Sequence, residues 1–535
     1  MPNTNEFDYI IIGGGSAGCV VASRLSENKD AKICLIEAGP SNWNPLYRVP
    51  MLAGRLYRAK LNNWFYFTEP QQHLNQRKIF WPRGRMLGGS FIFNGMVYIR
   101  GNAADYDRWS NEGNIGWSFS DVLPVFKKSE NFCEGANLFH GENGPLPVNK
   151  ARKFYPIFDH FVNAALQAGH TLNHDFNGTN QDGVGFYHFN IASGSRQTTA
   201  DTFLRNSRAS SNLRILTKRL VAKLLIKNGR ATGVLVENNG RLETLFARNE
   251  IILTAGALNT PQLLLLSGIG PADHLCSKGI KVIHELKGVG ENLQDHLDVA
   301  LAFKAKKPVS IIDNLRLDNF ILNLGKAAFG LGPSCASPIE AGGFFKSRSD
   351  CKEPDLQAFV LPIAATNASI WNPFSSRPSD TFAVRIGQVK PLSRGTVRLR
   401  SDNPLDHPVL QPNYLSEPAD LEAQIAGVHI VREIINQKAF QQIVSEEIEP
   451  GLDATNKRSI TDWIRNIASS VYHPVGTARM GVDELAVVDH QLKVRGLEGL
   501  RIADASVMPD IIAGNTNAPT IMIAERAAEF IIGNN

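Results

Sequence analysis

A glycine-rich turn close to the N-terminus, Gly13-x-Gly15-x-x-Gly18, is the feature that most constrains the fold of this chain. The β-branched run 7–12 before it predicts a buried strand, and residues 16–26 carry small and apolar side chains at helical spacing. Residues 32–37 predict a second buried strand. A strand, a glycine turn, a helix and a strand within about 30 residues make a dinucleotide-binding βαβ unit.

Each glycine has a role in such a unit. The first allows a tight turn, the second lets backbone N–H groups approach a pyrophosphate, and the third lets the helix pack closely on the strand. The helix N-terminus favours the anion. Glu37, 19 residues after Gly18, stands where a carboxylate accepts hydrogen bonds from ribose hydroxyls. A purely structural βαβ unit is the alternative, and the motif does not separate FAD from NAD.

The remaining sequence predicts two domains of different texture. Strand-forming runs return at 213–216, 221–226, 233–236, 250–256 and 500–505, before a terminal helix over 520–532. Between about 305 and 455, alternating apolar and polar residues in 381–389 and 395–400 favour antiparallel strands, and 418–437 predicts a helix. We therefore expect an α/β plus α+β protein. A discontinuous Rossmann-like domain would comprise 1–155, 200–305 and 456–535, and a substrate domain with a mostly antiparallel sheet covered by helices would comprise 156–199 and 306–455.

Composition excludes several classes of protein. A chain of 535 residues is too long for one ordinary core, which agrees with two domains. The formal charge of +5 is small for this length, and no basic run with interleaved aromatic residues indicates nucleic-acid binding. The six cysteines are scattered without a CxxC pair, so we expect no metal site and no redox dithiol, and a reducing compartment fits.

The sequence gives no sign of targeting to or across a membrane. Residues 1–8 lack a basic segment followed by an apolar one, so no signal peptide is expected. No stretch approaches the ~20 apolar residues that a spanning helix needs. We expect a cytoplasmic protein, while peripheral association with a membrane and the oligomeric state stay open.

Four sequence blocks follow one another in a defined order. They are FDYIIIGGGSAG with LIEAG at the N-terminus, PRGRMLGGS with NGMVYIRG over 82–101, GALNTPQLLLLSGIG over 256–270, and the C-terminal region of His473 and Asn517. Together they resemble the glucose–methanol–choline (GMC) flavoprotein oxidoreductases, nearest the bacterial choline and sorbose dehydrogenase branch. The block 256–270 fits the family's second signature throughout. Looser similarity, such as GVGENLQDH over 288–296, extends the resemblance over the whole chain.

The resemblance implies FAD rather than NAD as the cofactor. By position, it implies that the ADP half of FAD contacts Gly13, Gly15, Ser16, Ala17, Glu37 and Ala38, and that the flavin and pyrophosphate contact Met86, Gly89, Asn94, Gly95, Met96 and Val97. Val221 would meet the adenine through its backbone, and Trp64 would lie close to the cofactor. Asp504, Ala505, Asn515 and Thr520 would close the ribityl and pyrophosphate end. Met86 and Val221 could equally be core residues.

The segment after the double glycine departs from the family pattern. Small residues are usual there, followed by an aliphatic residue or a histidine, but this chain has Ser90-Phe-Ile-Phe-Asn94. Phe93 stands where some members attach FAD through histidine, so the resemblance implies non-covalent FAD. Phe91 and Phe93 either reshape the substrate pocket and its access to oxygen or simply fill core volume.

The C-terminal block carries the implied chemistry. Alone, His473 before Pro474 is a turn histidine, but the resemblance makes it the base that removes the hydroxyl proton while hydride passes to flavin N5. Imidazole suits this role because its ordinary pKa is about 6.5. The family's second active-site position, His or Asn, is matched by Asn517, whose amide would hold the substrate oxygen; Asn515 is the competing choice. His296, His407 and His490 are expected to be structural or surface residues.

The activity expected is FAD-dependent oxidation of an alcohol to an aldehyde or ketone. A non-redox lyase of the same family, resembling the hydroxynitrile lyases, is the alternative; a non-catalytic FAD module and an NAD-linked dehydrogenase are weaker ones. The partner is thus a small-molecule alcohol, with oxygen, a quinone or a cytochrome as electron acceptor. The identity of the alcohol would be set by the second domain and by loops around 45–65 and 310–345. No clear cluster of acids and aromatics demands a quaternary ammonium, for which Trp64, Tyr66 and Glu340 are the only candidates.

Overall fold

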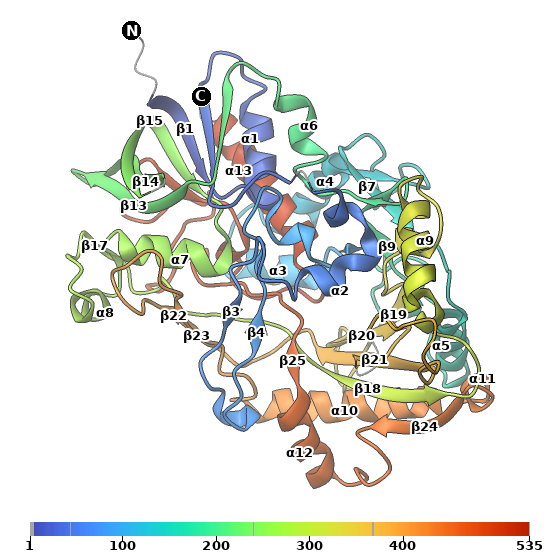
Figure 1. Ribbon diagram of the computed structural model, residues 1–535. Helices are drawn as coiled ribbons and strands as arrows, with labels where there is room; N and C mark the ends of the chain where they lie inside the picture. Colours follow the sequence, from blue (N-terminus) through green and yellow to red (C-terminus); the bar gives the residue numbers. More distant parts are fainter. Residues whose placement is uncertain (1–4, 43, 239, 366–368, 534–535) are drawn as a thin grey trace.

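The chain folds around two seven-stranded sheets (Figure 1). The computed structural model describes residues 5–42, 44–238, 240–365 and 369–533. Residues 1–4, half of the segment expected to lack a signal peptide, lie outside this range. Within the described residues, no helix combines the length and the apolar character needed to cross a bilayer.

The first sheet contains the predicted βαβ unit at its centre. Its order is β12-β2-β1-β15-β14-β13, with β26 pairing to β15. The pairs β1–β2, β2–β12, β1–β15 and β15–β26 are parallel, whereas β13, β14 and β15 form an antiparallel meander. The strands are β1 (Glu6–Ile12), β2 (Ile33–Glu37), β12 (Leu213–Thr217), β13 (Leu220–Lys227), β14 (Arg230–Asn238), β15 (Arg241–Leu253) and β26 (Leu500–Ile502). Distant parts of the sequence build one sheet, which confirms the discontinuous Rossmann-like fold.

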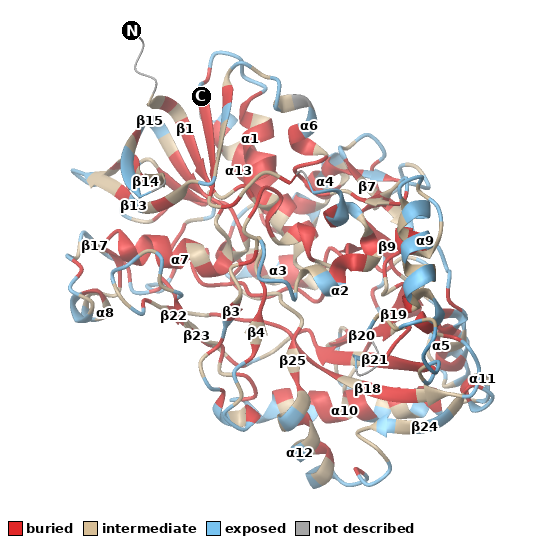
Figure 2. Cartoon of the chain, viewed as in Figure 1, coloured by how far each residue is buried: buried red, intermediate tan, exposed pale blue. Residues whose placement is uncertain are grey.

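Helices α1 and α13 pack against each other beside this sheet (Figure 1). α1 (Ser16–Leu25) is buried on nearly all sides because it lies between the sheet and α13 (Asn517–Ile532), as its red colour in Figure 2 shows. α7 (Gly256–Leu266) begins three residues after β15 ends, in the segment that matches the second family signature. The terminal helix begins at Asn517 rather than at residue 520, and this moves a predicted site residue onto the helix itself.

The second sheet is antiparallel throughout. Its order is β24-β18-β21-β20-β19-β8, and β25 pairs with β18. The strands are β8 (Gly183–Phe186), β18 (Leu297–Ala305), β19 (Ala341–Phe345), β20 (Leu356–Leu361), β21 (Thr381–Gln388), β24 (Val444–Glu449) and β25 (Ser469–Ser470). Helices α5 (Pro156–Gln167), α10 (Pro418–Ile435) and α12 (Lys457–Ile467) share an apolar core with it, and α10 runs along β18 and β21 in Figure 1. A mostly antiparallel sheet covered by helices is thus confirmed.

Alternation along these strands gives the second sheet two different faces. In β18, β20 and β21, every second residue enters the core against the helices, and the residues between them face the opposite side. The side chains that line a cavity on that opposite side are Asp298, Phe359, Leu361 and Arg385. The cavity face therefore mixes an acid, a base and apolar groups, while the helix face is apolar.

The predicted domain limits need correction in two places. Residues 297–305 and 469–470 were assigned to the first domain, but β18 and β25 pair within the second sheet. Residues 395–400 contain the predicted antiparallel strand, because β22 (Thr396–Arg398) pairs with β23 (Val409–Gln411), but these two strands form a separate two-stranded sheet. Which sheet a strand joins depends on partners distant in sequence, and the local pattern does not contain them. The rest of the division stays a prediction.

The other elements lie in the connections between these strands and helices. They are the helices α2 (Ala53–Leu56), α3 (Ala103–Asn111), α4 (Phe119–Ser129), α6 (Phe203–Ser207), α8 (Ala272–Ser277), α9 (Leu317–Ala327) and α11 (Lys438–Gln441), and the strands β3 (Tyr66–Phe67), β4 (Phe80–Trp81), β5 (Val97–Tyr98), β6 (Glu130–Phe132), β7 (Leu146–Lys150), β9 (His188–Phe189), β10 (Ile191–Ala192), β11 (Ser195–Arg196), β16 (Ile269–Gly270) and β17 (His284–Glu285).

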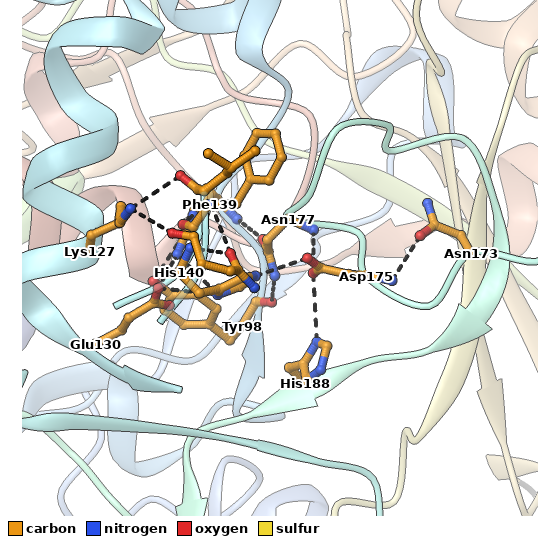
Figure 3. Close-up of polar contacts among 12 residues, drawn as sticks. Tyr98, Lys127, Glu130, Phe139, His140, Asn173, Asp175, Asn177 and His188 are labelled. Carbon is orange, nitrogen blue, oxygen red and sulfur yellow. Dashed lines mark hydrogen bonds and ion pairs between the residues drawn. The ribbon is translucent and has the colours of Figure 1, made fainter. Parts of the chain in front are cut away.

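A buried cluster of charged groups joins several of these connections (Figure 3). Arg100 Nη2 donates to Glu130 Oε1 at 2.5 Å, and the ring of His140 lies between Glu130 and Asp175, 3.1 Å and 2.9 Å from their oxygens. Burial lowers the pKa of His140, but the two carboxylates outweigh this effect and raise it. None of these four side chains lines the cavity, so their role is to hold the connections together.

Candidate active site

One cavity of about 410 Å³ is lined by both halves of the molecule. Its walls come from the glycine turn, the starts of β13 and α7, the segment 89–97, the cavity face of the second sheet and the C-terminal block. Of the predicted cofactor residues, only Met86 does not line it; Met86 is buried against Tyr47, Ile92 and Phe93 and is a core residue. His473 and Asn517 also line the cavity.

The glycine turn fits a dinucleotide. Gly13 has φ +105°, and a Cβ on it would lie 2.6 Å from the Thr254 carbonyl oxygen. A Cβ on Gly18 would lie 1.9 Å from the Gly13 carbonyl oxygen, so the third glycine is required for packing. A Cβ on Gly15, by contrast, would approach no protein atom closer than 3.8 Å. Because Gly15 lines the cavity, the space beside its backbone is available to a ligand.

Glu37 ends β2 beside this turn and is buried. Its Oε2 accepts from the Gly14 N–H and its Oε1 from the Gly39 N–H, both at 2.8 Å. Burial raises the pKa of this carboxyl against the opposing effect of those bonds. Each carboxylate oxygen can accept a second hydrogen bond. Glu37 can therefore hold the glycine turn and still receive a ribose hydroxyl.

The unusual segment after the double glycine lies against the cavity. Phe91 and Phe93 are both buried and both line it, so each ring fills core volume and also shapes the wall. Arg196 anchors this segment, since its Nη1 donates to the carbonyl oxygens of Phe91 and Asn94 and to Asn94 Oδ1. Burial lowers the pKa of Arg196 to about 9. The anchor holds the segment from behind, because Arg196 is not a cavity residue.

Asp504 and Thr520 line the far end of the cavity with their side chains already bonded. Asp504 Oδ2 accepts from the Gly256 N–H at 2.9 Å and from Thr260 Oγ1 at 2.6 Å, which ties the start of α7 to the C-terminal block. Thr520 Oγ1 donates to the Thr516 carbonyl oxygen within α13. Both residues thus fix the shape of this wall.

His473 is paired with a second histidine that the sequence suggested was structural. His296 Nε2 lies 3.1 Å from the Val389 carbonyl oxygen, to which it can only donate, so neutral His296 presents Nδ1 as an acceptor. His473 Nδ1 lies 3.0 Å from that atom and must therefore donate to it. This assignment of protons leaves His473 Nε2 unprotonated and able to accept a proton.

Asp295 fixes the position of His473, and burial together with nearby cationic and histidine side chains determines its charge. Asp295 Oδ1 accepts from the His473 N–H at 2.6 Å, and its Oδ2 accepts from the hydroxyls of Ser470 and Tyr414. Burial lowers the pKa of His473 well below its usual value, and His296, Arg83 and Arg385 lower it further. The imidazole is thus neutral and oriented in the resting protein.

The amide beside His473 belongs to Asn515, the competing choice, and not to Asn517. Asn515 Nδ2 lies 3.4 Å from His473 Nε2, and its Oδ1 accepts from Gln357 Nε2 at 3.2 Å. Asn517 Oδ1 instead accepts from Ser16 Oγ at 2.7 Å, next to the glycine turn. The reason is the start of α13, because Asn517 is its first residue and projects toward the start of α1. Asn515 thus lies beside the histidine, and Asn517 lies beside the glycine turn.

The candidates for a quaternary ammonium site do not converge. Trp64 lines the cavity and stacks on Tyr66, with 5.9 Å between ring centroids. The Tyr66 hydroxyl is hydrogen-bonded by Asn259, and Arg85 lies 4.8 Å above the Trp64 ring. Glu340 is buried outside the cavity wall, where it accepts from the Arg152 N–H. Within the described part of the chain, no group of three His, Cys, Asp or Glu could hold a metal ion.

The comparisons with known proteins agree on one family. GMC oxidoreductase models match residues 7–298 and residues 391–524. The chain is 41% identical to the alcohol dehydrogenase (acceptor) of Pseudomonas putida, over 98% of this chain and 96% of that protein. It is 40% identical to the oxygen-dependent choline dehydrogenase of Cronobacter sakazakii, over 99% of this chain and 95% of that one.

A solved structure has the same fold. Formate oxidase of Aspergillus oryzae, described for modification of its FAD, superposes with a TM-score of 0.92 at 26% identity, covering 100% of this chain and 99% of that chain. The family models span most of this chain, and the glycine turn and cavity fit the cofactor. The chain therefore belongs to the GMC oxidoreductase family, whose motifs it carries, and is an FAD-dependent enzyme that acts on CH–OH donors.

Proposed function

We propose that this enzyme oxidises an alcohol to an aldehyde or ketone, with His473 Nε2 as the base that takes the hydroxyl proton. The observation that carries this proposal is the Val389–His296–His473 hydrogen-bond chain, which leaves Nε2 as an acceptor toward the cavity. A base must be unprotonated before it can act, and the lowered pKa keeps His473 neutral at physiological pH.

FAD would be held by the glycine turn, Glu37 and the segment 89–97 at one side of the cavity, in the non-covalent form that Phe93 implies. When bound, it supplies the acceptor for the hydride that leaves the alcohol carbon. The chain itself supplies the base, the amide that positions the oxygen, and walls that exclude water. A group that contacts the oxygen accelerates the reaction only if it binds the developing alkoxide more strongly than the alcohol, so its placement is decisive.

Asn515 is the residue proposed to hold the substrate oxygen. Its Nδ2 is next to His473 Nε2, so one oxygen atom lying between them could donate its proton to the ring while accepting from the amide. The bond from Gln357 to Asn515 Oδ1 fixes which end of the amide faces the histidine. Asn517, bonded to Ser16, is proposed to shape the phosphate end of the cofactor site.

Anaerobic stopped-flow mixing with a panel of alcohols tests this proposal, with bleaching of the flavin near 450 nm as the signal. His473→Ala should keep its FAD but reduce it ~10²-fold or more slowly, the scale of losing a general base. Asn515→Ala should slow reduction by ~10²-fold, the scale of losing one oxyanion donor.

Asn517→Ala is the matched control, because it removes the same amide two positions along the chain. It should reduce FAD at a near-normal rate and release it more readily. Equal effects of the two asparagine variants would contradict the assignment, as would near-normal reduction by His473→Ala. Absence of bleaching with every alcohol would favour the non-redox lyase.

A further inference from the structure

The cavity wall near His473 contains an ion pair that the reaction does not use. Asp298 of β18 and Arg385 of β21 come from adjacent antiparallel strands, and both line the cavity. Arg385 Nε donates to Asp298 Oδ2 at 2.6 Å, and its Nη2 donates to Asp298 Oδ1 at 2.5 Å. Such a bidentate pair is the strongest geometry that these groups form.

The pair lies where the non-reacting part of a substrate would pass. Arg385 is close enough to His473 to contribute to its lowered pKa, and Tyr57 and Tyr472 line the same cavity. Asp298 is only 2% exposed, whereas the Arg385 side chain is 25% exposed. Of the two charges, the positive one is therefore the more open to the cavity.

No other acid on the described cavity wall is free to receive a cation. The other two cavity-lining carboxylates are Glu37, which accepts two backbone N–H groups, and Asp504, which accepts from Gly256, Thr260 and Ser506. Glu37 lies beside the glycine turn and Asp504 at the start of α7, on the cofactor side of the cavity. A cationic substrate would thus find its one nearby carboxylate already neutralised.

Aromatic rings do not replace that carboxylate. Tyr57, Phe93 and Tyr472 line the cavity and could lie against a cation, whereas the ring of Trp64 already has Tyr66 and Arg85 against it. One desolvated cation–π contact contributes less free energy than an ion loses when it leaves water. The exposed edge of Arg385 adds repulsion between like charges. Ile339, Phe359, Leu361 and Val471 add apolar side chains to the cavity wall. Apolar walls favour a hydrocarbon group over a charged one.

We infer, on the basis of the proposed function, that the substrate is an uncharged alcohol with an apolar body, and that the Asp298–Arg385 pair excludes quaternary ammonium alcohols. The pair acts by removing a counter-ion and presenting a like charge, so it discriminates by repulsion as well as by fit. Similarity to proteins named choline dehydrogenase therefore does not extend to the charge of the substrate.

A pair of alcohols that differ only in charge tests the inference. Choline and 3,3-dimethylbutan-1-ol have the same shape, because a quaternary carbon replaces the quaternary nitrogen. Flavin reduction and dye-linked turnover should give a kcat/KM at least tenfold higher for the neutral alcohol. The same comparison with longer matched pairs covers a substrate of different length.

The outcomes separate the inference from the proposed function. Preference for the charged member of the pairs overturns the inference and leaves alcohol oxidation intact. Absence of flavin reduction by every alcohol of both series refutes the proposed function, and this inference with it. Faster reduction by the neutral series supports both.

Variants of the pair show whether charge is the cause. Arg385→Met leaves Asp298 unpaired, so at pH 8 the ratio of kcat/KM for choline to that for its isostere should rise at least tenfold. Arg385→Lys keeps the charge and should change the ratio little. The double variant Asp298→Asn/Arg385→Met removes both charges and leaves no unpaired charge, so it should keep the preference for the neutral alcohol. An unchanged ratio in Arg385→Met with normal FAD content would overturn the inference.

Discussion

His296 gives the sharpest test of how His473 is kept ready to accept a proton. In His296→Leu, the His473 Nδ1–H loses its acceptor, which lies 3.0 Å away in a buried site. Leaving a buried donor without a partner costs about 1–3 kcal/mol. The ring can avoid this loss by moving its proton to Nε2, and that proton blocks the base. Since each 1.4 kcal/mol is a factor of ten, flavin reduction should slow by about 5- to 150-fold.

The assay is anaerobic stopped-flow reduction at saturating alcohol, which separates the limiting rate from substrate binding. His296 is a positioning residue, so the limiting rate should fall while the alcohol concentration for half-maximal rate changes by less than about threefold. His296→Asn can offer an acceptor oxygen near the position of Nδ1 and should recover part of the rate. His490→Leu changes an exposed histidine and serves as the matched control.

The reasoning would be refuted if His296→Leu bound FAD fully and reduced it within about twofold of the wild-type rate. It would also be refuted if the Leu and Asn variants were slowed equally, because loss of packing alone would then explain both. A fall confined to substrate binding would move the role of His296 from the base to the pocket.

Two further predictions follow from the same site. Because burial, His296, Arg83 and Arg385 lower the pKa of His473, the base is neutral down to a pH well below 6.5. The limiting rate of flavin reduction should therefore be flat from pH 8 to pH 6.5 and fall only at lower pH. A fall centred near pH 6.5 would contradict the lowered pKa. Because Phe93 cannot bond to FAD, acid precipitation should release all the yellow colour into the supernatant; colour that stays with the pellet would reveal a covalent link.

Local patterns predicted the parts of the fold that local forces determine. β1, α1 and β2 lie within about two residues of their predicted limits, because hydrophobic period and glycine position act within a few residues. Residues 297–305 were assigned to the first domain and no strand was predicted there, although the alternation of β18, with Leu297, Val299 and Leu301 on one side, is present in the sequence. Its partner, β21, is more than 70 residues away, and no local pattern names it.

In the candidate site too, the sequence did not predict contacts between residues that are far apart along the chain. His296 was expected to be structural or at the surface because its sequence surroundings are polar and turn-like. Its partner His473 is 177 residues away, and only the fold brings the rings together. Asn517 was chosen over Asn515 because the resemblance matched it to the family's second active-site position, and with the terminal helix expected to begin at residue 520 both asparagines stood in a loop. With Asn517 as the first helical residue, its side chain turns toward Ser16. The helix begins three residues earlier than expected, and this start determines which asparagine lies beside His473.

The groups proposed for the reaction and those inferred to select the substrate lie on different parts of the structure. His296 directly precedes β18, His473 follows β25 and Asn515 precedes α13, so the chemistry is carried by the ends of elements. Asp298 and Arg385 instead project from the strands β18 and β21, whose backbones are fixed by pairing on both sides. Strand side chains can change without moving the backbone that orients the base. Two relatives with substrates as different as their names imply match this chain at 41% and 40% identity, so overall similarity cannot choose between them. The inferred role of the Asp298–Arg385 ion pair does distinguish between these substrates, because the pair acts on the part of the alcohol that the reaction leaves unchanged.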